Sequence, residues 1–304
     1  MKIRPTAIWL LVVSLLFFAS PLPAQDIGPH FKKIQEGIYV YSAKPADSNA
    51  GIILTQDGVV LIDSGHNPPD SRAVLSAVKK LTSQPVRFLI NTEPHADHTT
   101  GHFLFSPPAV IVAHEGATDS MNKAYNPKRN EKLMSDYPEM SQAFEGFRLI
   151  TPHIEYRQKM ILNVGGRTLE LLYLKSVHSE ADTAVWLPKE RVLFSAAVAG
   201  VKRFSNLRPF VQIEDMLSAM KMLKSLNPEI VVPGHGAPGT TKIFDATAQY
   251  YTLLLERVGK MVKEGKSLDA IKKELRMPES DDWASKDRFG TNVEAAYRAV
   301  KQRS

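Results

Sequence analysis

The densest chemical cluster in the chain is the segment from Glu93 to His98, which reads Glu-Pro-His-Ala-Asp-His. Two imidazoles and two carboxylates occupy six positions directly after the apolar run 86–90. Imidazole nitrogen and carboxylate oxygen are the ligands that bind zinc or iron in open catalytic sites. Burying His95, Asp97 and His98 together without a metal would be costly. The segment therefore predicts a metal-binding loop at the end of a strand.

Two further histidines lie in loops that follow apolar runs. His178 stands in Val-His-Ser-Glu-Ala-Asp-Thr, residues 177–183, and His235 stands in Val-Pro-Gly-His-Gly, residues 232–236. A histidine beside glycine or aspartate at the end of a strand is a better candidate for a metal ligand than for a core residue. The chain has no cysteine, so neither a thiolate ligand nor a disulfide is available. Three other histidines near these loops complete no motif and are predicted not to bind metal: His66, His102 and His114.

Runs of apolar residues bounded by turn residues predict the strands that position these loops. The expected strands are residues 38–41, 51–54, 58–63, 86–90, 109–113, 159–162, 168–174, 183–187, 192–194 and 229–232. Apolar residues at helical spacing predict helices over 71–81, 213–226, 240–264, 267–275 and 291–302, and another that begins near residue 115. The charged segment 121–148 is expected to form helices over one face, near the site.

Two strand-rich halves, each ending in helices, predict an α+β fold with the four-layer αββα sandwich architecture. No linker rich in glycine, serine or proline separates the halves. With 304 residues and 43% apolar content, the chain is long enough for one large core. Residues 25–304 are therefore expected to form a single domain.

The first 24 residues have the pattern of a secretory signal peptide. Lys2 and Arg4 precede the apolar run 7–18, and Ala24 is the expected last residue before cleavage. Cleavage there would place residues 25–304 in a bacterial periplasm or outside the cell, without stable membrane insertion. The apolar run is short for a membrane span, and an uncleaved anchor is the alternative.

The net charge of +6 at pH 7 is spread along the chain rather than gathered into a basic stripe. A nucleic-acid groove would need such a stripe, so nucleic acid is not an expected partner. A small-molecule substrate is the partner that a metal-binding loop of this kind predicts. The sequence favours no particular oligomeric state.

Several segments resemble, in the same order, those of the metallo-β-lactamase superfamily. The matching segments are residues 61–65, 93–98, 113–115, 177–183, 191–197 and 232–236. The resemblance implies a first metal site made of Glu93, His95 and His178. It also implies a second site made of Asp97, His98 and His235, with a water or hydroxide between the metals. Two zinc ions per chain are the cofactor that it implies.

Two positions depart from the family's pattern. Glu93 stands where the family has histidine, and Ala197 stands where many members have a bridging aspartate and others a cysteine. The number of carboxylate ligands stays at two, and the arrangement is similar to the third subclass of metallo-β-lactamases. A His₂Glu zinc site is a known catalytic type, while the carboxylate keeps iron and manganese open as alternatives. In a different interpretation, Glu93 accepts a hydrogen bond from a ligand histidine or points to solvent.

The ligand set and the resemblance imply a metal-dependent hydrolase in which Asp97 orients the attacking metal-bound hydroxide. A β-lactam is the first candidate substrate, and a lactone, a thioester or another activated ester fits the same chemistry. Two other classes stay open: a degenerate member that binds one metal weakly without turnover, and an iron-dependent sulfur dioxygenase. Substrate choice is expected to lie in residues 64–70, 115–148 and 198–212. Three basic residues there could hold a substrate carboxylate or be ordinary solvated charges: Lys202, Arg203 and Arg208.

Overall fold

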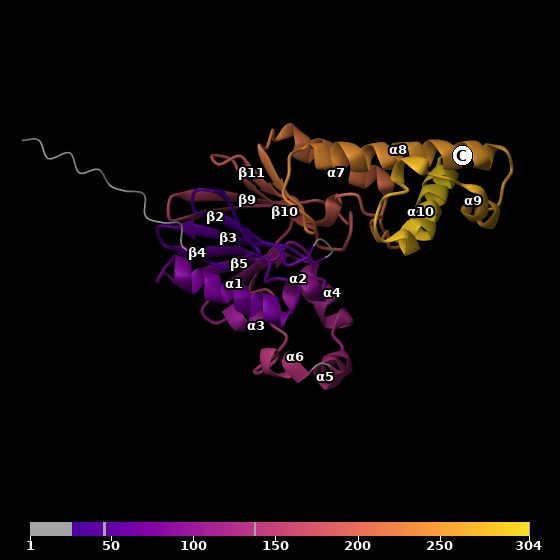
Figure 1. Ribbon diagram of the computed structural model, residues 1–304. Coiled ribbons are helices and arrows are strands. Elements are labelled where there is room, and N and C mark those ends of the chain that lie inside the picture. Colours follow the sequence, from indigo (N-terminus) through magenta and orange to yellow (C-terminus); the bar gives the residue numbers. More distant parts are fainter. Residues whose placement is uncertain (1–25, 45–46, 137, 304) are drawn as a thin grey trace, which may run out of the picture.

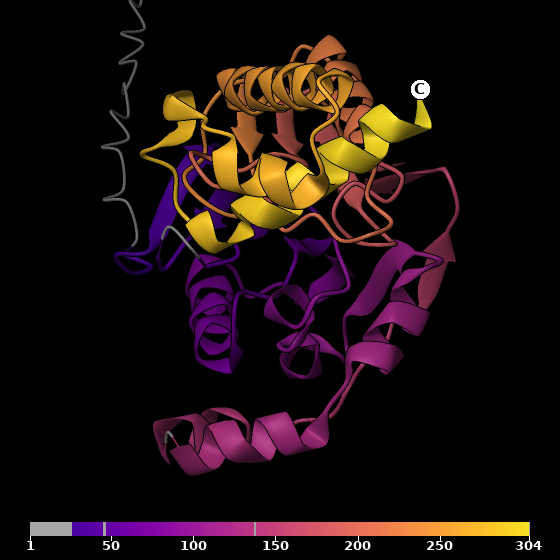
Figure 2. The ribbon, with the colours of Figure 1, turned by 90° about the vertical axis from the view of Figure 1, so that its right-hand side faces the viewer.

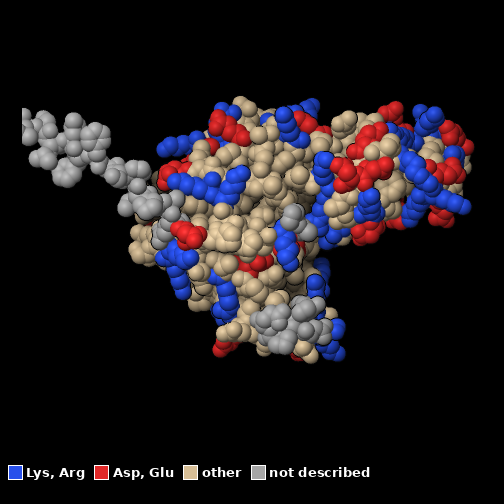
Figure 3. Space-filling model, in the orientation of Figure 1, with Lys and Arg blue, Asp and Glu red and all other residues tan. Residues whose placement is uncertain are grey.

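The computed structural model describes residues 26–44, 47–136 and 138–303 (Figure 1). The predicted signal peptide, residues 1–24, lies outside the described residues, so it stays a prediction. None of the helices in the described part is both long and apolar enough to span a bilayer. Acidic and basic side chains are interspersed on the face shown in Figure 3.

The first half of the chain forms a seven-stranded sheet with the strand order β1-β2-β3-β4-β5-β6-β7. Its strands are β1 (Phe31–Gln35), β2 (Ile38–Tyr41), β3 (Ala50–Thr55), β4 (Gly58–Ile62), β5 (Val86–Ile90), β6 (Val110–His114) and β7 (Ile154–Tyr156). Strands β1 to β4 pair antiparallel, and β4 to β7 pair parallel. Strand β4 is buried along its whole length, as expected for a parallel strand that is covered on both faces.

The second half forms a five-stranded sheet with the order β12-β11-β10-β9-β8. Its strands are β8 (Lys159–Val164), β9 (Arg167–Tyr173), β10 (Thr183–Leu187), β11 (Val192–Phe194) and β12 (Ile230–Val232). Strands β8 to β11 pair antiparallel. Strand β12 returns parallel to β11 after the helix α7 (Ile213–Ser225), and so delivers the loop that carries His235.

The two sheets pack face to face, and helices cover their outer faces (Figure 1). The core between the sheets contains Ile53 and Ile62 of the first sheet and Val185 and Phe194 of the second. Helix α1 (Pro68–Leu81) packs on the outer face of the first sheet. Helices α7 and α8 (Lys242–Lys263) pack on the outer face of the second. The predicted α+β, four-layer αββα sandwich is the architecture observed.

The other helices lie in connecting loops and at the C-terminal end. They are α2 (Ala96–Thr99), α3 (His102–Phe105), α4 (Ala117–Ala124), α5 (Pro127–Asp136), α6 (Pro138–Ala143), α9 (Leu268–Glu274) and α10 (Phe289–Gln302), with 3-10 turns at Ala196–Val198, Pro278–Ser280 and Lys286–Arg288. Figure 2 shows α5 and α6 standing away from the sheets on one side and the C-terminal helices on the other.

Most predicted elements are present, with two instructive differences. The helix predicted over 71–81 begins earlier, at Pro68. Asn67 caps it by accepting a hydrogen bond from the Asp70 amide (3.0 Å), and proline suits the first helical position. The sequence pattern also does not predict β1 and β7, the edge strands of the first sheet, because an edge strand needs less burial and carries a weaker apolar pattern.

Candidate metal centre

The carboxyl ends of β4 and β5 place the ligand loop at one end of the first sheet. Asp63 directly follows β4 and has a left-handed backbone conformation, with φ of 54°. Its carboxylate accepts hydrogen bonds from the Thr92 amide (2.7 Å), the Thr92 hydroxyl (2.5 Å) and Nδ2 of Asn91 (3.2 Å). These bonds join the two strand ends, so the loop 93–98 starts from a fixed position.

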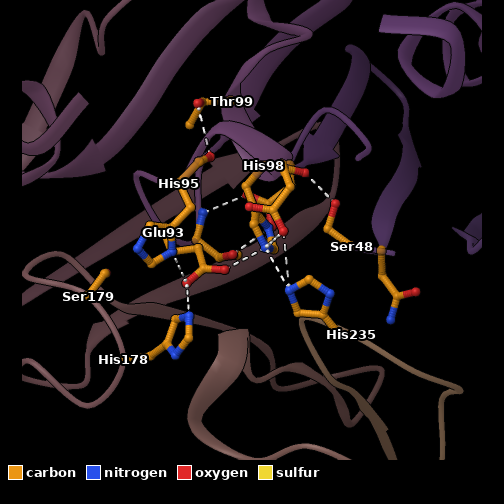
Figure 4. Close-up of polar contacts among 12 residues, drawn as sticks. Ser48, Glu93, His95, His98, Thr99, His178, Ser179 and His235 are labelled. Carbon is orange, nitrogen blue, oxygen red and sulfur yellow. Dashed lines mark hydrogen bonds and ion pairs between the residues drawn. The ribbon is translucent and has the colours of Figure 1, made fainter. Parts of the chain in front are cut away.

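Glu93, His95 and His178 form the first ligand group (Figure 4). Oε2 of Glu93 lies 3.0 Å from Nδ1 of His95 and 3.3 Å from Nε2 of His178. His178 lies in the loop between β9 and β10, where Asp182 accepts hydrogen bonds from the backbone amides of His178 (2.6 Å) and Ser179 (2.8 Å). These are the three residues predicted for the first metal site.

Glu93 also belongs to a second ligand group, with His98 and His235. Nε2 of His98 lies 2.5 Å from Oε1 of Glu93 and 3.4 Å from Nε2 of His235. Asp97, predicted for this site, stands at its edge, with Oδ2 3.4 Å from Nε2 of His235 and 3.8 Å from Nε2 of His98. The structure thus brings all six predicted residues together and places Glu93 against both groups.

His98 is oriented by a residue that the sequence pattern does not single out. Nδ1 of His98 donates a hydrogen bond to Oδ2 of Asp63 (2.8 Å), which leaves Nε2 directed into the centre. In the sequence, Asp63 stands out only as part of the matching segment 61–65. An acidic residue directly after a fully apolar strand is the signal that could have identified it, because a buried carboxylate needs partners.

Charges within the centre compensate one another. Glu93 is only 1% exposed, so the interpretation in which it points to solvent is wrong. Burial would raise the pKa of Glu93, but His98 holds it well below its usual value. Burial would lower the pKa of His98, but Glu93 and Asp63 hold it well above its usual value. A metal ion would take the place of the proton that His98 carries.

The donor set fits a metal ion. Oε1 of Glu93 lies 2.5 Å from Nε2 of His98 but has no hydrogen-bond partner among the described residues. Burial lowers the pKa of His178 to about 3 and also lowers that of His235, so both rings are neutral and carry a nitrogen lone pair. Groups of two imidazoles and one carboxylate suit zinc with an open position for water.

Four of the five residues in the two ligand groups line a cavity of about 570 Å³, and the fifth, His98, is fully buried. One wall comes from α4, α5, α6 and the residues that follow them. Its large apolar members include Met121, Tyr125, Phe144, Phe147 and Leu149, and Arg129 of α5 adds a positive charge to it. The other wall carries the guanidinium groups of Arg203, Arg208 and Arg288.

The predicted substrate segments 64–70, 115–148 and 198–212 all contribute lining residues. Arg208 donates a hydrogen bond from Nη1 to the backbone oxygen of His178 (2.7 Å), which connects this wall to the first ligand group. Lys202 instead forms an ion pair with Asp282 at the exposed surface. This agrees with the alternative in which Lys202 is an ordinary solvated charge. Arg288 was not predicted, because it reaches the cavity from the start of α10.

The three histidines predicted not to bind metal lie outside both ligand groups. His66 lines the cavity. His114 stacks on Tyr173 with ring centroids 3.7 Å apart. His102 is buried, and its Nδ1 donates a hydrogen bond to the carbonyl oxygen of Ile150 (3.0 Å).

We expect His102 to make the fold sensitive to acid. Burial lowers the pKa of its ring from 6.5 to about 4. Between these values the unfolded chain binds a proton that the folded chain does not. The free energy of unfolding should therefore fall with decreasing pH, by about 1.4 kcal/mol per unit at most. Urea unfolding of the metal-free protein at about pH 7 and about pH 5 measures this loss.

A His102→Gln variant is the control, because its amide can still donate to Ile150 without titrating. Its loss of stability between the two pH values should be smaller than that of the unchanged protein by about 2 kcal/mol. Equal losses in the two proteins would contradict the role of His102.

An αββα sandwich with histidine and carboxylate ligands at the strand ends is the architecture of a metallo-hydrolase class. Residues 43–235 match the family described as the Metallo-beta-lactamase superfamily, and the chain belongs to that superfamily. The linear primary-alkylsulfatase of a Pseudomonas species is 21% identical over 262 residues, which are 75% of this chain and 49% of the relative. The type 2 metallo-beta-lactamase of Bacillus sp. (strain 170) is 25% identical over 203 residues, which are 66% of this chain and 70% of the relative.

Two solved structures agree with this fold. The sec-alkylsulfatase Pisa1 from Pseudomonas sp. superposes with a TM-score of 0.70 at 17% identity, covering 88% of this chain and 49% of its own. A metallo-beta-lactamase from Pontibacter korlensis superposes with a TM-score of 0.58 at 19% identity, covering 72% of this chain and 96% of its own. The chain therefore spans about half the length of the alkylsulfatase relatives. The family is one of metal-dependent hydrolases, and at these identities the solved structures establish the fold.

Proposed function

We propose that this chain is an exported, metal-dependent hydrolase with a dinuclear centre that takes zinc. The observation that carries the proposal is a pair of three-donor groups that share Glu93 beside one cavity, with Asp97 next to the second group. When bound there, two zinc ions supply Lewis acidity and lower the pKa of a water. Iron or manganese is the alternative that the carboxylate donor allows. Export rests on the sequence pattern of residues 1–24.

The chain's own residues would position the reactants and move the proton. Oδ2 of Asp97 lies 3.4 Å from Nε2 of His235 and 3.9 Å from Nδ1 of His66, and the Asp97 side chain is 31% exposed. It is therefore placed to orient the attacking water and to accept its proton. Arg203 and Arg208 would hold an anionic group of the substrate through charge-assisted hydrogen bonds.

A β-lactam is the first candidate substrate. Relatives of this chain include metallo-beta-lactamases of Bacillus species. A β-lactam carries a carboxylate for the arginine wall and a strained amide for attack at the centre. Lactones, thioesters and other activated esters fit the same attack and form the alternative within this chemistry.

A sulfate ester with an apolar tail is a second candidate substrate. The cavity lining favours it, because Arg203, Arg208 and Arg288 would face the sulfate while the apolar and aromatic lining residues would cover the tail. Two relatives are alkylsulfatases by name, which adds support. Hydrolysis of a sulfate ester would use the same metal centre. It differs from hydrolysis of a β-lactam only in the bond that is broken.

Metal content and turnover of the purified full-length chain test the proposal. We expect two zinc ions per chain and hydrolysis of at least one of four probes: nitrocefin, an acyl-homoserine lactone, an acyl thioester and an alkyl sulfate. Removal of zinc by a chelator should abolish turnover, and added zinc should restore it. Zinc at a hundred times its Kd should also add about 2.7 kcal/mol to the free energy of unfolding.

Other outcomes would identify the remaining classes. One weakly bound ion and no turnover would establish the degenerate member. Oxygen consumption with a persulfide by the iron-loaded protein would establish the dioxygenase.

A further inference from the structure

We propose that the carboxylate of Glu93 bridges the two metal sites, with Oε2 in the first site and Oε1 in the second. This inference rests on the proposed dinuclear centre and goes beyond the assignment of Glu93 to the first site alone. Figure 4 shows the Glu93 side chain between His95 and His178 on one side and His98 and His235 on the other. The proposal gives each carboxylate oxygen its own pair of histidines.

The two oxygens of Glu93 have different neighbours. Oε2 lies 3.0 Å from Nδ1 of His95 and 3.3 Å from Nε2 of His178. Oε1 lies 2.5 Å from Nε2 of His98, which in turn lies 3.4 Å from Nε2 of His235. An imidazole at this position would offer one ring nitrogen to the centre, whereas a carboxylate offers two oxygens. Glutamate in the place of the family's histidine therefore adds one metal-donor atom at this position.

Glu93 is the residue common to both ligand groups among the described residues. The position at which the family pattern has a bridging aspartate is occupied by Ala197, whose methyl group lines the same cavity and offers no donor. A bridging Glu93 would supply the shared carboxylate that Ala197 cannot provide. The two departures from the family pattern would then compensate for each other.

The backbone around Glu93 is fixed in a way that suits a bridge. Nδ2 of Asn91 donates to the carbonyl oxygen of Glu93 (2.7 Å) and also to Oδ1 of Asp63 (3.2 Å). The same Asp63 orients His98 through its other oxygen. Glu93 is 1% exposed, so its side chain has no solvent-directed alternative. Asp63 therefore sets the relative positions of Glu93 and His98.

Stepwise metal binding separates a bridge from a terminal ligand. The metal-free full-length protein is titrated with Co²⁺, and both binding constants are followed by visible absorption and by metal content after gel filtration. We compare Glu93→Gln with two matched variants that each alter one group, His178→Gln and His235→Gln. A bridge predicts that Glu93→Gln weakens both constants by at least about a hundredfold. Each histidine variant should weaken mainly the metal-binding constant of the one site to which its histidine belongs.

A second variant serves if Glu93→Gln fails to fold, as judged by its circular dichroism. Glu93→His supplies an imidazole to the first site and no donor to the second. We expect it to keep the first constant within about tenfold and to lose at least about a hundredfold in the second. The readout is metal affinity, so it does not depend on finding the substrate.

Two results would overturn the proposal, and they differ from each other. If the unchanged protein binds two Co²⁺ ions and Glu93→His keeps the second constant, Glu93 belongs to the first site alone and the dinuclear centre stands. If the unchanged protein binds fewer than two ions, the dinuclear centre itself is wrong and the bridge falls with it.

Discussion

An Asp97→Ala variant is expected to lose about two to four orders of magnitude in kcat, which is the usual contribution of a positioned general base. Asp97 is the carboxylate of the centre that faces the open cavity, with 31% of its side chain exposed. Burial would raise its pKa, but His98 holds it below its usual value, so it is ionised at neutral pH. Steady-state kinetics on the best substrate of the probe panel measure the loss.

Asp47→Ala is the matched control for this prediction. Asp47 also faces His66, with Oδ1 3.7 Å from Nε2, but Asp97 additionally lies 3.4 Å from Nε2 of His235 and 3.8 Å from Nε2 of His98. We expect Asp47→Ala to keep kcat within about tenfold, since it touches neither the centre nor the attacking water. The metal content of both variants must be measured, because a loss of zinc from Asp97→Ala would move the explanation from proton transfer to metal binding. A kcat for Asp97→Ala equal to that of the unchanged protein would refute the proposed role.

Replacing Asp63 by alanine is expected to lower the free energy of unfolding by about 3–5 kcal/mol. The carboxylate accepts hydrogen bonds from Thr92, Asn91 and His98, all of which are buried. Its removal leaves several buried donors without an acceptor and separates the ends of β4 and β5. Urea unfolding of the metal-free protein at neutral pH measures the change.

An Asp63→Asn variant separates the structural role of this residue from its effect on the metal. Asparagine tolerates the left-handed backbone at this position and can still accept from Thr92. It cannot supply the negative charge that holds His98. We therefore expect Asp63→Asn to retain more stability than Asp63→Ala while binding the second metal about 10–100-fold more weakly. Unchanged metal affinity in Asp63→Asn would show that the orientation of His98 does not depend on Asp63.

Much of the architecture could be predicted because it depends on local patterns. The strands that carry the ligand loops are short apolar runs with clear ends, as 86–90 and 183–187 show, and both were predicted with their observed bounds. The edge strands β1 and β7 were missed, because they are held by pairing with one neighbour rather than by burial of a regular pattern. The four-layer arrangement follows from the need to cover two amphipathic sheets with helices.

By itself, the sequence determined which donor residues make up the candidate centre. His95, Asp97 and His98 follow a strand in a pattern that predicts a metal site, and the later strand-end loops add His178 and His235 in the family's order.

The tertiary structure alone decided how these residues face one another. It placed Glu93 between two pairs of histidines. It also placed Asp63 where its carboxylate orients His98, and it brought Arg288 from the C-terminal part of the chain to the cavity wall. Such contacts depend on how two sheets pack and where distant loops meet. A local pattern of residue types specifies which donors are present, whereas the direction of each oxygen and nitrogen is set by neighbours far away in the chain.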